Sequence, residues 1–325
     1  MRYTYRVTKY DPDDRDECGR YVGAEEASCD HGPVESAYLR AVAAFAAEVG
    51  VDHVMIREPQ IPDVVHFGLE PSVEGYGLAG LFPPDLTGFH DGAAVSIAVC
   101  LELVRAMLRD NGAWCRLEVE DVFAVHVGWD QYVYVGTDKV CDNASARTHS
   151  LGLFAEPLVA SPYDAAFDDQ CGERRPADDS FWMRLRRHVT EHRAVLLEER
   201  YIQGASRWHR LTDDTVEATR ARLTPRSRLI LWPDLSSDVE TVLADLPDDG
   251  FVEMVWEDEL GRIISATVDD TSFADLTTHV ARARAASIVG TGDAGPRPLL
   301  TGVLPDSDGV LRARWGIDSA ADGND

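Results

Sequence analysis

The sequence predicts an α+β protein with two domains of mixed or antiparallel sheet, joined by a helical segment. Short runs that alternate apolar and polar residues, as strands do, recur between longer runs with the helical spacing of apolar residues. Of its 325 residues 45% are hydrophobic and 27% charged, which is enough apolar material for two compact cores. We place the first domain at 1–165, a linker with Arg-rich helices at 166–228, the second domain at 229–316 and a disordered polar tail at 317–325.

The first domain is expected to start with a strand and to end with a meander. Alternation indicates a strand over 2–9. Pro33 then begins a helix whose apolar residues recur every three or four positions until Gly50 ends it. The other elements expected here are a strand at 54–56, an irregular excursion over 59–90, a helix at 93–109, and strands at 114–119, 122–127 and 131–136.

The second half is expected to open with helices and to continue as an α+β unit. Apolar periodicity indicates an amphipathic helix over 181–202 and a shorter one over 216–223. The turn sequence Asp-Ser-Asp-Gly at 306–309 predicts a final hairpin between 300–304 and 310–315. Between them we expect a strand at 229–232, a helix at 236–246, a hairpin over 251–268 and a helix at 272–286.

The charge balance favours a basic partner. The formal net charge is −26, from 57 acidic and 31 basic residues, and such a field repels phosphate backbones and anionic lipid head groups. No apolar run is long enough to span a bilayer. The six cysteines are too widely spread for a disulfide framework. We therefore expect a cytoplasmic protein with no membrane contact.

Two segments of the first domain resemble an uncharacterised family of small bacterial α+β proteins. They are the start YRVTKY at residues 5–10 and the hairpin at 125–136, with the pattern VHxGxDxYxYxG. The likeness covers about half of the chain, departs from the family pattern at Trp129 and Gln131, and implies no known activity. In style the chain is also similar to bacterial toxin-immunity proteins, which implies a partner-binding role.

The hairpin is the first candidate for a binding surface. An aromatic anchor beside a charge at its turn is the composition of interface hot spots. Alternation along the strand places His126 on the less bulky face. The predicted partner-binding residues are His126, Trp129, Asp130, Tyr132 and Tyr134. In the alternative interpretation the aromatic residues cap the first core. The leading hypothesis is a non-enzymatic protein that binds a basic protein, such as a toxin or nuclease domain, and needs no cofactor.

A zinc-dependent hydrolase is the second hypothesis. His188 and His192 stand four residues apart in an H-x-x-E-H arrangement, so on a helix both imidazoles share a face and can bind one Zn²⁺. Glu191 would be the catalytic residue that polarises a bound water. A third ligand would come from downstream, with Glu253 or Glu257 as candidates. Neighbouring arginines oppose a dication at this place.

Nucleic-acid binding is the third hypothesis. The segment 174–228 is rich in arginine, and Trp182, Tyr201 and Trp208 are interleaved with the charges, so stacking on bases is conceivable. Acidic residues are interspersed through the same segment, which favours local ion pairs within the protein instead.

Overall fold

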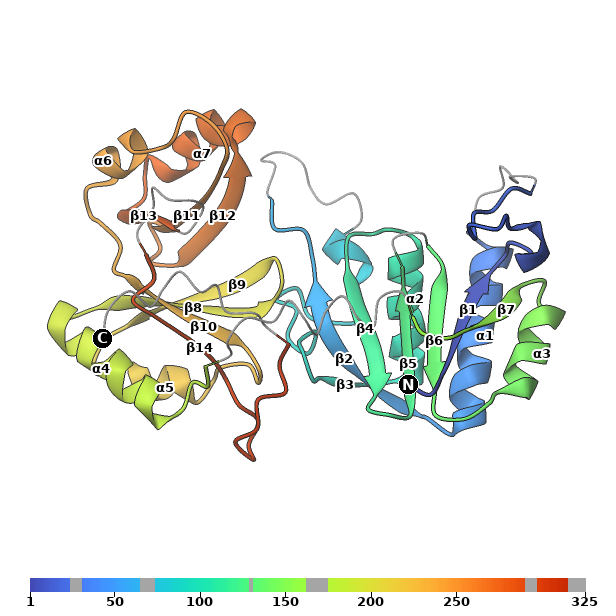
Figure 1. Cartoon of the computed structure of the whole chain (residues 1–325). Helices are drawn as coiled ribbons and strands as arrows, with labels where there is room; N and C mark the ends of the chain where they lie inside the picture. Colours follow the sequence, from blue (N-terminus) through green and yellow to red (C-terminus); the bar gives the residue numbers. More distant parts are fainter. Residues whose placement is uncertain (24–30, 65–73, 129–130, 162–174, 290–296, 315–325) are drawn as a thin grey trace. The chain divides into compact units, whose positions relative to one another are not determined.

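The computed structural model describes residues 1–23, 31–64, 74–128, 131–161, 175–289 and 297–314 (Figure 1). The chain divides into two compact units. We call Met1–Pro59 with Ser72–Gln170 the N-terminal unit, and Gln60–Pro71 with Cys171–Asp325 the C-terminal unit. The predicted α+β class is confirmed, because helices accompany sheets whose strands pair antiparallel. In the part of the chain that is described, no helix has both the length and the apolar character needed to cross a membrane.

The N-terminal unit is built on one seven-stranded sheet, with the order β3-β2-β4-β5-β6-β1-β7. Its strands and helices are β1 (Tyr3–Thr8), α1 (Pro33–Val49), β2 (His53–Gln60), β3 (Ala94–Ser96), α2 (Ile97–Leu108), β4 (Trp114–Val119), β5 (Phe123–Val127), β6 (Val133–Thr137), α3 (Asp142–Ser150) and β7 (Phe154–Leu158). Short 3₁₀ turns occur at Pro12–Asp14 and Glu74–Gly77.

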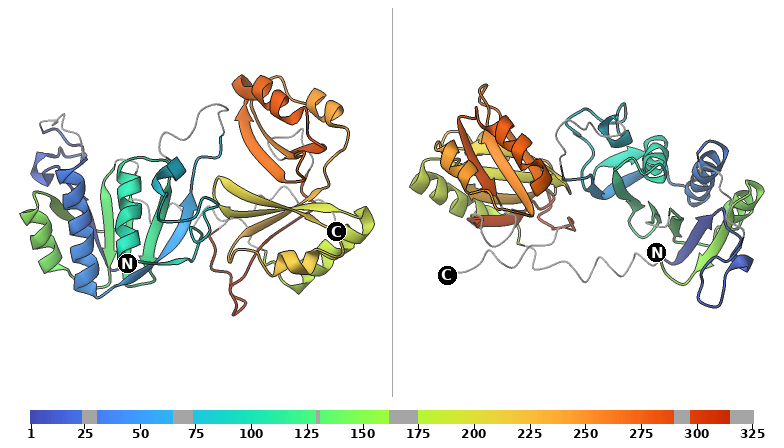
Figure 2. Two further views of the ribbon diagram at one scale, coloured as in Figure 1. Left: turned by 180° about the vertical axis from the view of Figure 1, so that it is seen from behind. Right: turned by 90° about the horizontal axis from the view of Figure 1, so that it is seen from above.

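Helices α1 and α2 lie side by side on one face of this sheet (Figure 2). Helix α1 begins at Pro33, as predicted, and ends where Gly50 adopts a φ of 81°, which costs glycine no steric strain. Helix α2 begins later than predicted, because Ser96 caps it by accepting a hydrogen bond from the Val99 amide. Strand β3 takes the place of the expected first turn. The sequence also did not predict α3 and β7, although β7 extends the sheet beyond β1.

The C-terminal unit contains a four-stranded sheet, β14-β10-β8-β9, and a three-stranded sheet, β12-β11-β13. Its elements are α4 (Asp179–His192), β8 (Val195–Ile202), β9 (Ala205–Leu211), α5 (Val216–Arg220), β10 (Arg228–Pro233), α6 (Val239–Ala244), β11 (Phe251–Glu257), β12 (Ile263–Asp269), a 3₁₀ turn (Asp270–Ser272), α7 (Phe273–Val280), β13 (Ala285–Val289) and β14 (Leu300–Val303).

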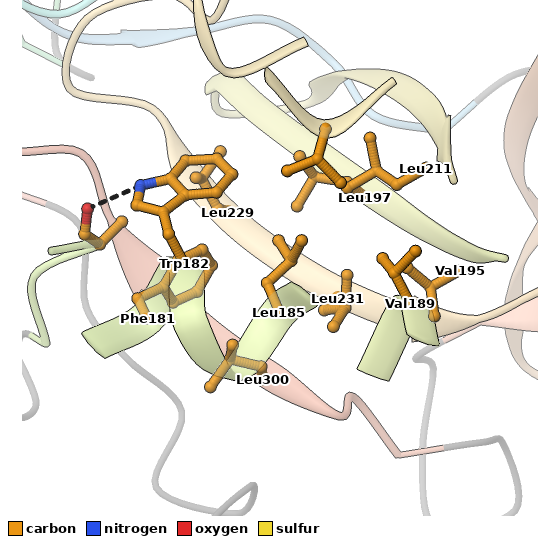
Figure 3. Close-up of a cluster of buried hydrophobic side chains, with 12 residues drawn as sticks. Phe181, Trp182, Leu185, Val189, Val195, Leu197, Leu211, Leu229, Leu231 and Leu300 are labelled. Atoms are coloured by element: carbon orange, nitrogen blue, oxygen red, sulfur yellow. Dashed lines mark hydrogen bonds between the residues drawn. The ribbon is translucent and has the colours of Figure 1, made fainter. Parts of the chain in front are cut away.

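Helix α4 covers one face of the four-stranded sheet (Figure 3). Leu185 and Val189 of the helix are fully buried against Leu197 of β8 and Leu231 of β10. At the start of the helix the Trp182 indole Nε1 donates a hydrogen bond to the Ala177 carbonyl oxygen at 3.1 Å, so the buried polar atom is satisfied. Val216 of α5 joins the same cluster.

The other face of the four-stranded sheet packs against the three-stranded sheet. Leu196 of β8 and Trp232 of β10 meet Val255 of β11 and Val289 of β13 there. Alternate residues of the three-stranded sheet point the other way, where α6 and α7 cover them. The unit is therefore a four-layer stack of helices, sheet, sheet and helices (Figure 1).

From residue 175 on, the segment predicted as a linker with Arg-rich helices belongs to the C-terminal unit. The helix expected over 181–202 stops at His192, because Arg193 adopts a φ of 68° that a right-handed helix cannot accommodate. Strand β8 follows and pairs with β9 on one side and β10 on the other. Strand β14 also differs from the prediction, because it pairs with β10, and the described residues 310–314 of the predicted hairpin form no strand.

Candidate functional sites

The hairpin of β5 and β6 holds the residues predicted to contact a partner. His126 and Tyr134 stand opposite each other in the strand register, with rings stacked 5.2 Å apart. Only 5% of His126 and 2% of Tyr134 is exposed, in contrast with the prediction, so neither is presented to a partner. Burial, with a contribution from the charge of Arg116, lowers the pKa of His126 to about 3 and keeps its ring neutral. Trp129 and Asp130 lie outside the described residues.

Tyr132 is the member of the predicted set that the structure leaves partly exposed. The guanidinium groups of Arg6 and Arg15 lie 5.5 and 5.3 Å from the centre of its ring. Tyr10 contacts the same ring edge-on, with centroids 6.0 Å apart. Arg6 also donates to the Glu156 carboxylate of β7 at 2.6 Å. Tyr132 therefore belongs to a cluster of aromatic rings and cations at the edge of the sheet.

A cavity of about 490 Å³ lies next to this cluster. Its lining combines the phenols of Tyr10 and Tyr21, whose centroids are 4.6 Å apart, with the side chains of Lys9, Asp11 and Asp14. The start of α1 and residues 151–154 form the remaining wall. A volume of this size accepts a small polar molecule or one side chain of a partner.

The predicted metal residues of α4 lie together. His188, Glu191 and His192 each offer a ligand atom, and these atoms are within 4.8 Å of one another. The two imidazole rings are nearly parallel, at 12°, with centroids 6.1 Å apart. Burial lowers the pKa of His188, and the charge of Arg187 acts in the same direction. This shift of the His188 pKa favours the neutral imidazole, which is the form that binds metal ions.

The candidates for a third ligand lie elsewhere in the unit. Glu253 shares a face of β11 with Val255, which packs on the side of the four-stranded sheet opposite to α4. The Oε2 atom of Glu253 is 3.8 Å from Nη2 of Arg200 on that side. Glu257 accepts a hydrogen bond from Arg210 at 3.2 Å. Neither glutamate therefore completes the predicted ligand set, because the sheet separates them from α4.

A buried carboxylate network between the two sheets was not predicted. Glu198 of β8 is fully buried and accepts hydrogen bonds from Arg200 Nη2 at 2.6 Å, Ser206 Oγ at 2.7 Å and Trp232 Nε1 at 3.0 Å. Burial and the neighbouring charge of Glu198 raise the pKa of Glu253 to about 7. The signal available in the sequence was an adjacent glutamate pair, followed by Arg200, in a run at 195–202 whose other residues are apolar or aromatic.

Several arginines of the segment 174–228 form ion pairs inside the C-terminal unit. Ion pairs join Arg186 with Glu217, Arg187 with Glu191, Arg200 with Glu198, Arg210 with Asp234, Arg220 with Asp179, and Arg226 with Asp306. Trp182 and Tyr201 are 2% and 6% exposed, so two of the three aromatic residues considered for base stacking are buried. These contacts agree with the expected local ion pairs.

A long segment of the C-terminal unit contains acidic residues but no lysine or arginine. Residues 229–261 contain ten carboxylates and no lysine or arginine, namely Asp234, Asp238, Glu240, Asp245, Asp248, Asp249, Glu253, Glu257, Asp258 and Glu259. Within the described residues, the exposed side chains of Asp245, Asp248 and Asp249 form no ion pair. Phe251 follows them directly and is 54% exposed.

Comparison with protein-family models, with curated proteins and with solved structures finds no match to this chain.

Proposed function

We propose that this protein binds a cationic protein partner through the surface around Phe251. The Phe251 surface consists of Phe251 with Asp245, Asp248, Asp249 and Asp270, all of which are exposed. The observation that carries the proposal is a large aromatic side chain left in solvent next to exposed carboxylates that form no ion pair with any described residue. Such a ring gains free energy when a partner covers it.

The position of Phe251 explains why it is not part of the core. It is the first residue of β11, the central strand of the three-stranded sheet, and it pairs with Asp269 of β12. Val252 and Met254 of the same strand are buried under α6 and α7. Phe251 points to the other face, where Val255 packs against the four-stranded sheet, but at the exposed end of the strand.

The charges around Phe251 select the sign of the partner. Asp248 and Asp249 precede Phe251, and Asp270 follows its strand neighbour Asp269, so acidic residues flank Phe251 in two chain segments. The net charge of −26 adds a long-range field of the same sign. Opposite charges on a partner would raise the association rate, while burial of Phe251 would lower the dissociation rate.

The partner class we propose is a basic toxin or nuclease domain, which this protein would sequester in the manner of an immunity protein or antitoxin. Such a complex places an acidic surface over the cationic surface that the toxin uses on nucleic acid or membranes. Binding of this kind requires only a complementary shape and opposite charge, and it involves no catalytic step.

The test measures binding of the full chain to a synthetic peptide that alternates Arg with Leu, with a Glu-Leu peptide of equal length as the charge control. We expect saturable binding of the Arg-Leu peptide alone, weakened by added salt. Phe251→Ser should weaken it by about 1 to 3 kcal/mol, the usual range for an interface anchor. The double variant Asp248→Asn, Asp249→Asn should mainly slow association.

A matched control separates the Phe251 surface from general acidity. Asp121→Asn removes one carboxylate from an exposed turn of the N-terminal unit and should leave binding unchanged. If Phe251→Ser and Asp121→Asn behave alike, the peptide is held by net charge only and the proposed surface is refuted. Equal binding of both peptides would refute the charge selection.

A further inference from the structure

The C-terminal end of α4 brings together three side chains that the proposed partner-binding function does not use. His188, Glu191 and His192 lie at positions i, i+3 and i+4 of the last turns of the helix, which ends at His192. Their ligand atoms are within 4.8 Å of one another. Tetrahedral coordination at the usual metal–ligand distances requires separations of about 3.4 Å. Rotation of the exposed Glu191 and His192 side chains closes the difference.

The donor set matches one class of ion. Two imidazole nitrogens and one carboxylate oxygen are ligands that Zn²⁺ and its first-row neighbours prefer, whereas Ca²⁺ and Mg²⁺ prefer oxygen alone. The Nδ1 atom of His188 is buried and has no hydrogen-bond partner among the described residues. The fold therefore leaves one ring nitrogen of His188 without a hydrogen-bond partner among the described residues. Three protein ligands leave a fourth position for water.

The charges around the cluster include one that favours a metal ion and one that opposes it. The cluster stands at the carbonyl end of α4, where the helix dipole favours a cation. Arg187 opposes one, because its Nε atom is 3.4 Å from Oε1 of Glu191. Both of these side chains are more than half exposed, and an ion pair of this kind contributes little, so a metal ion can displace the arginine.

We propose that His188, Glu191 and His192 bind one divalent transition-metal ion of the Zn²⁺ class at the end of α4. The bound ion links side chains from successive turns at the C-terminal end of α4, just before Arg193 ends the helix and the chain continues into β8. Its role there is to fix the end of the helix, and it is independent of the Phe251 surface.

The test uses the full chain without a histidine tag, stripped with EDTA and titrated with ZnCl₂ in a calorimeter. We expect one saturable equivalent. His192→Ala should weaken binding by more than about tenfold, the scale at which even supporting residues of metal sites act. Arg187→Ala should strengthen it by about two- to fivefold, which is the value of an exposed ion pair expressed as affinity. His53→Ala, which changes an exposed histidine of the N-terminal unit, should have no effect.

A second readout identifies the ligands. The Co²⁺ complex of this site should show only weak visible bands, because nitrogen and oxygen ligands lack the intense near-ultraviolet transition of a thiolate. A strong thiolate band would assign the ion to cysteines and overturn the proposal. Unchanged titration of His192→Ala, or no saturable binding to the parent protein, would overturn it as well. Circular dichroism of each variant checks that α4 is folded.

Discussion

Replacing Glu253 by Gln is expected to stabilise the C-terminal unit at neutral and alkaline pH. Glu253 lies between the two sheets of this unit, close to the fully buried Glu198. Arg200 is the cation that faces both carboxylates, and Asp63 adds a third negative charge nearby. When Glu253 ionises, the group therefore carries more negative than positive charge in a poorly solvated place. A Gln side chain keeps the shape and removes the charge.

The size of the expected stability gain follows from the pKa of Glu253, which is about 7 in the folded protein compared with an ordinary value of 4.5. The folded state holds the proton more tightly than the unfolded state. The contribution of protonated Glu253 to the free energy of unfolding is therefore fully present below pH about 4.5, and it is lost as the pH rises through about 7. The difference of about 2.5 pH units corresponds to about 3 kcal/mol. Above pH 8 the Gln variant should exceed the parent protein in stability by up to this amount, and near pH 4 the two should be similar.

Urea unfolding followed by tryptophan fluorescence measures this difference, because Trp232 donates to Glu198 inside the same network. Curves for parent and variant are compared from pH 4 to pH 9. Glu240→Gln is the matched control, since it changes an exposed glutamate of α6 that forms no ion pair within the described chain. The control should differ from the parent by the same amount at every pH.

The dependence of the stability gain on pH decides whether ionisation of Glu253 destabilises the C-terminal unit. If the stability gained by Glu253→Gln is the same at pH 4 and pH 9, ionisation of Glu253 does not oppose the stacking of the two sheets. A gain that shrinks as the pH rises would show that Glu253 is a stabilising partner of Arg200, with the opposite sign to the one derived from its burial.

Two further predictions concern packing in the C-terminal unit. Leu185→Ala leaves a cavity under α4 and should cost about 2 to 5 kcal/mol in urea unfolding, whereas Met183→Ala on the exposed side of the helix should change stability by less than about 0.5 kcal/mol. Gly204→Ala would place a methyl group against the Ile61 carbonyl oxygen and should cost about 1 to 3 kcal/mol, with faster hydrogen exchange at the Ile61 amide. Gly250→Ala is its control, because its φ of 93° is similar but no atom lies near the added carbon, so a larger loss there would contradict the collision argument.

Local patterns of apolar and polar residues predicted several of the helices and strands. The α1 helix was recognisable between Pro33 and Gly50, and the sequence also predicted a strand over 122–127, where β5 lies. The residues His188, Glu191 and His192 were also recognisable as a cluster, because helical spacing alone brings them together. Each of these inferences needed only neighbours in sequence.

The stretch 195–202 shows where this reasoning ends. Its leucines, glutamates and arginine are good helix formers, so the sequence predicted a continuation of α4. The structure makes it β8, because β9 and β10 pair with its two edges, while α4 covers one of its faces and the three-stranded sheet covers the other. The adjacent Glu198 and Glu199 tolerate this burial only because donors arrive from other elements, including Trp232 and His209.

The α+β class, the excess of negative charge and the cluster on α4 were predictable from the amino-acid sequence, since they depend on composition and on residues within one helical turn or one strand of each other. The burial of His126 and Tyr134, the proximity of Glu253 to Glu198 and the exposure of Phe251 became known only with the folded chain. Burial of a side chain is set by strands and helices that pack from distant parts of the chain, and no local pattern records which of them will cover it.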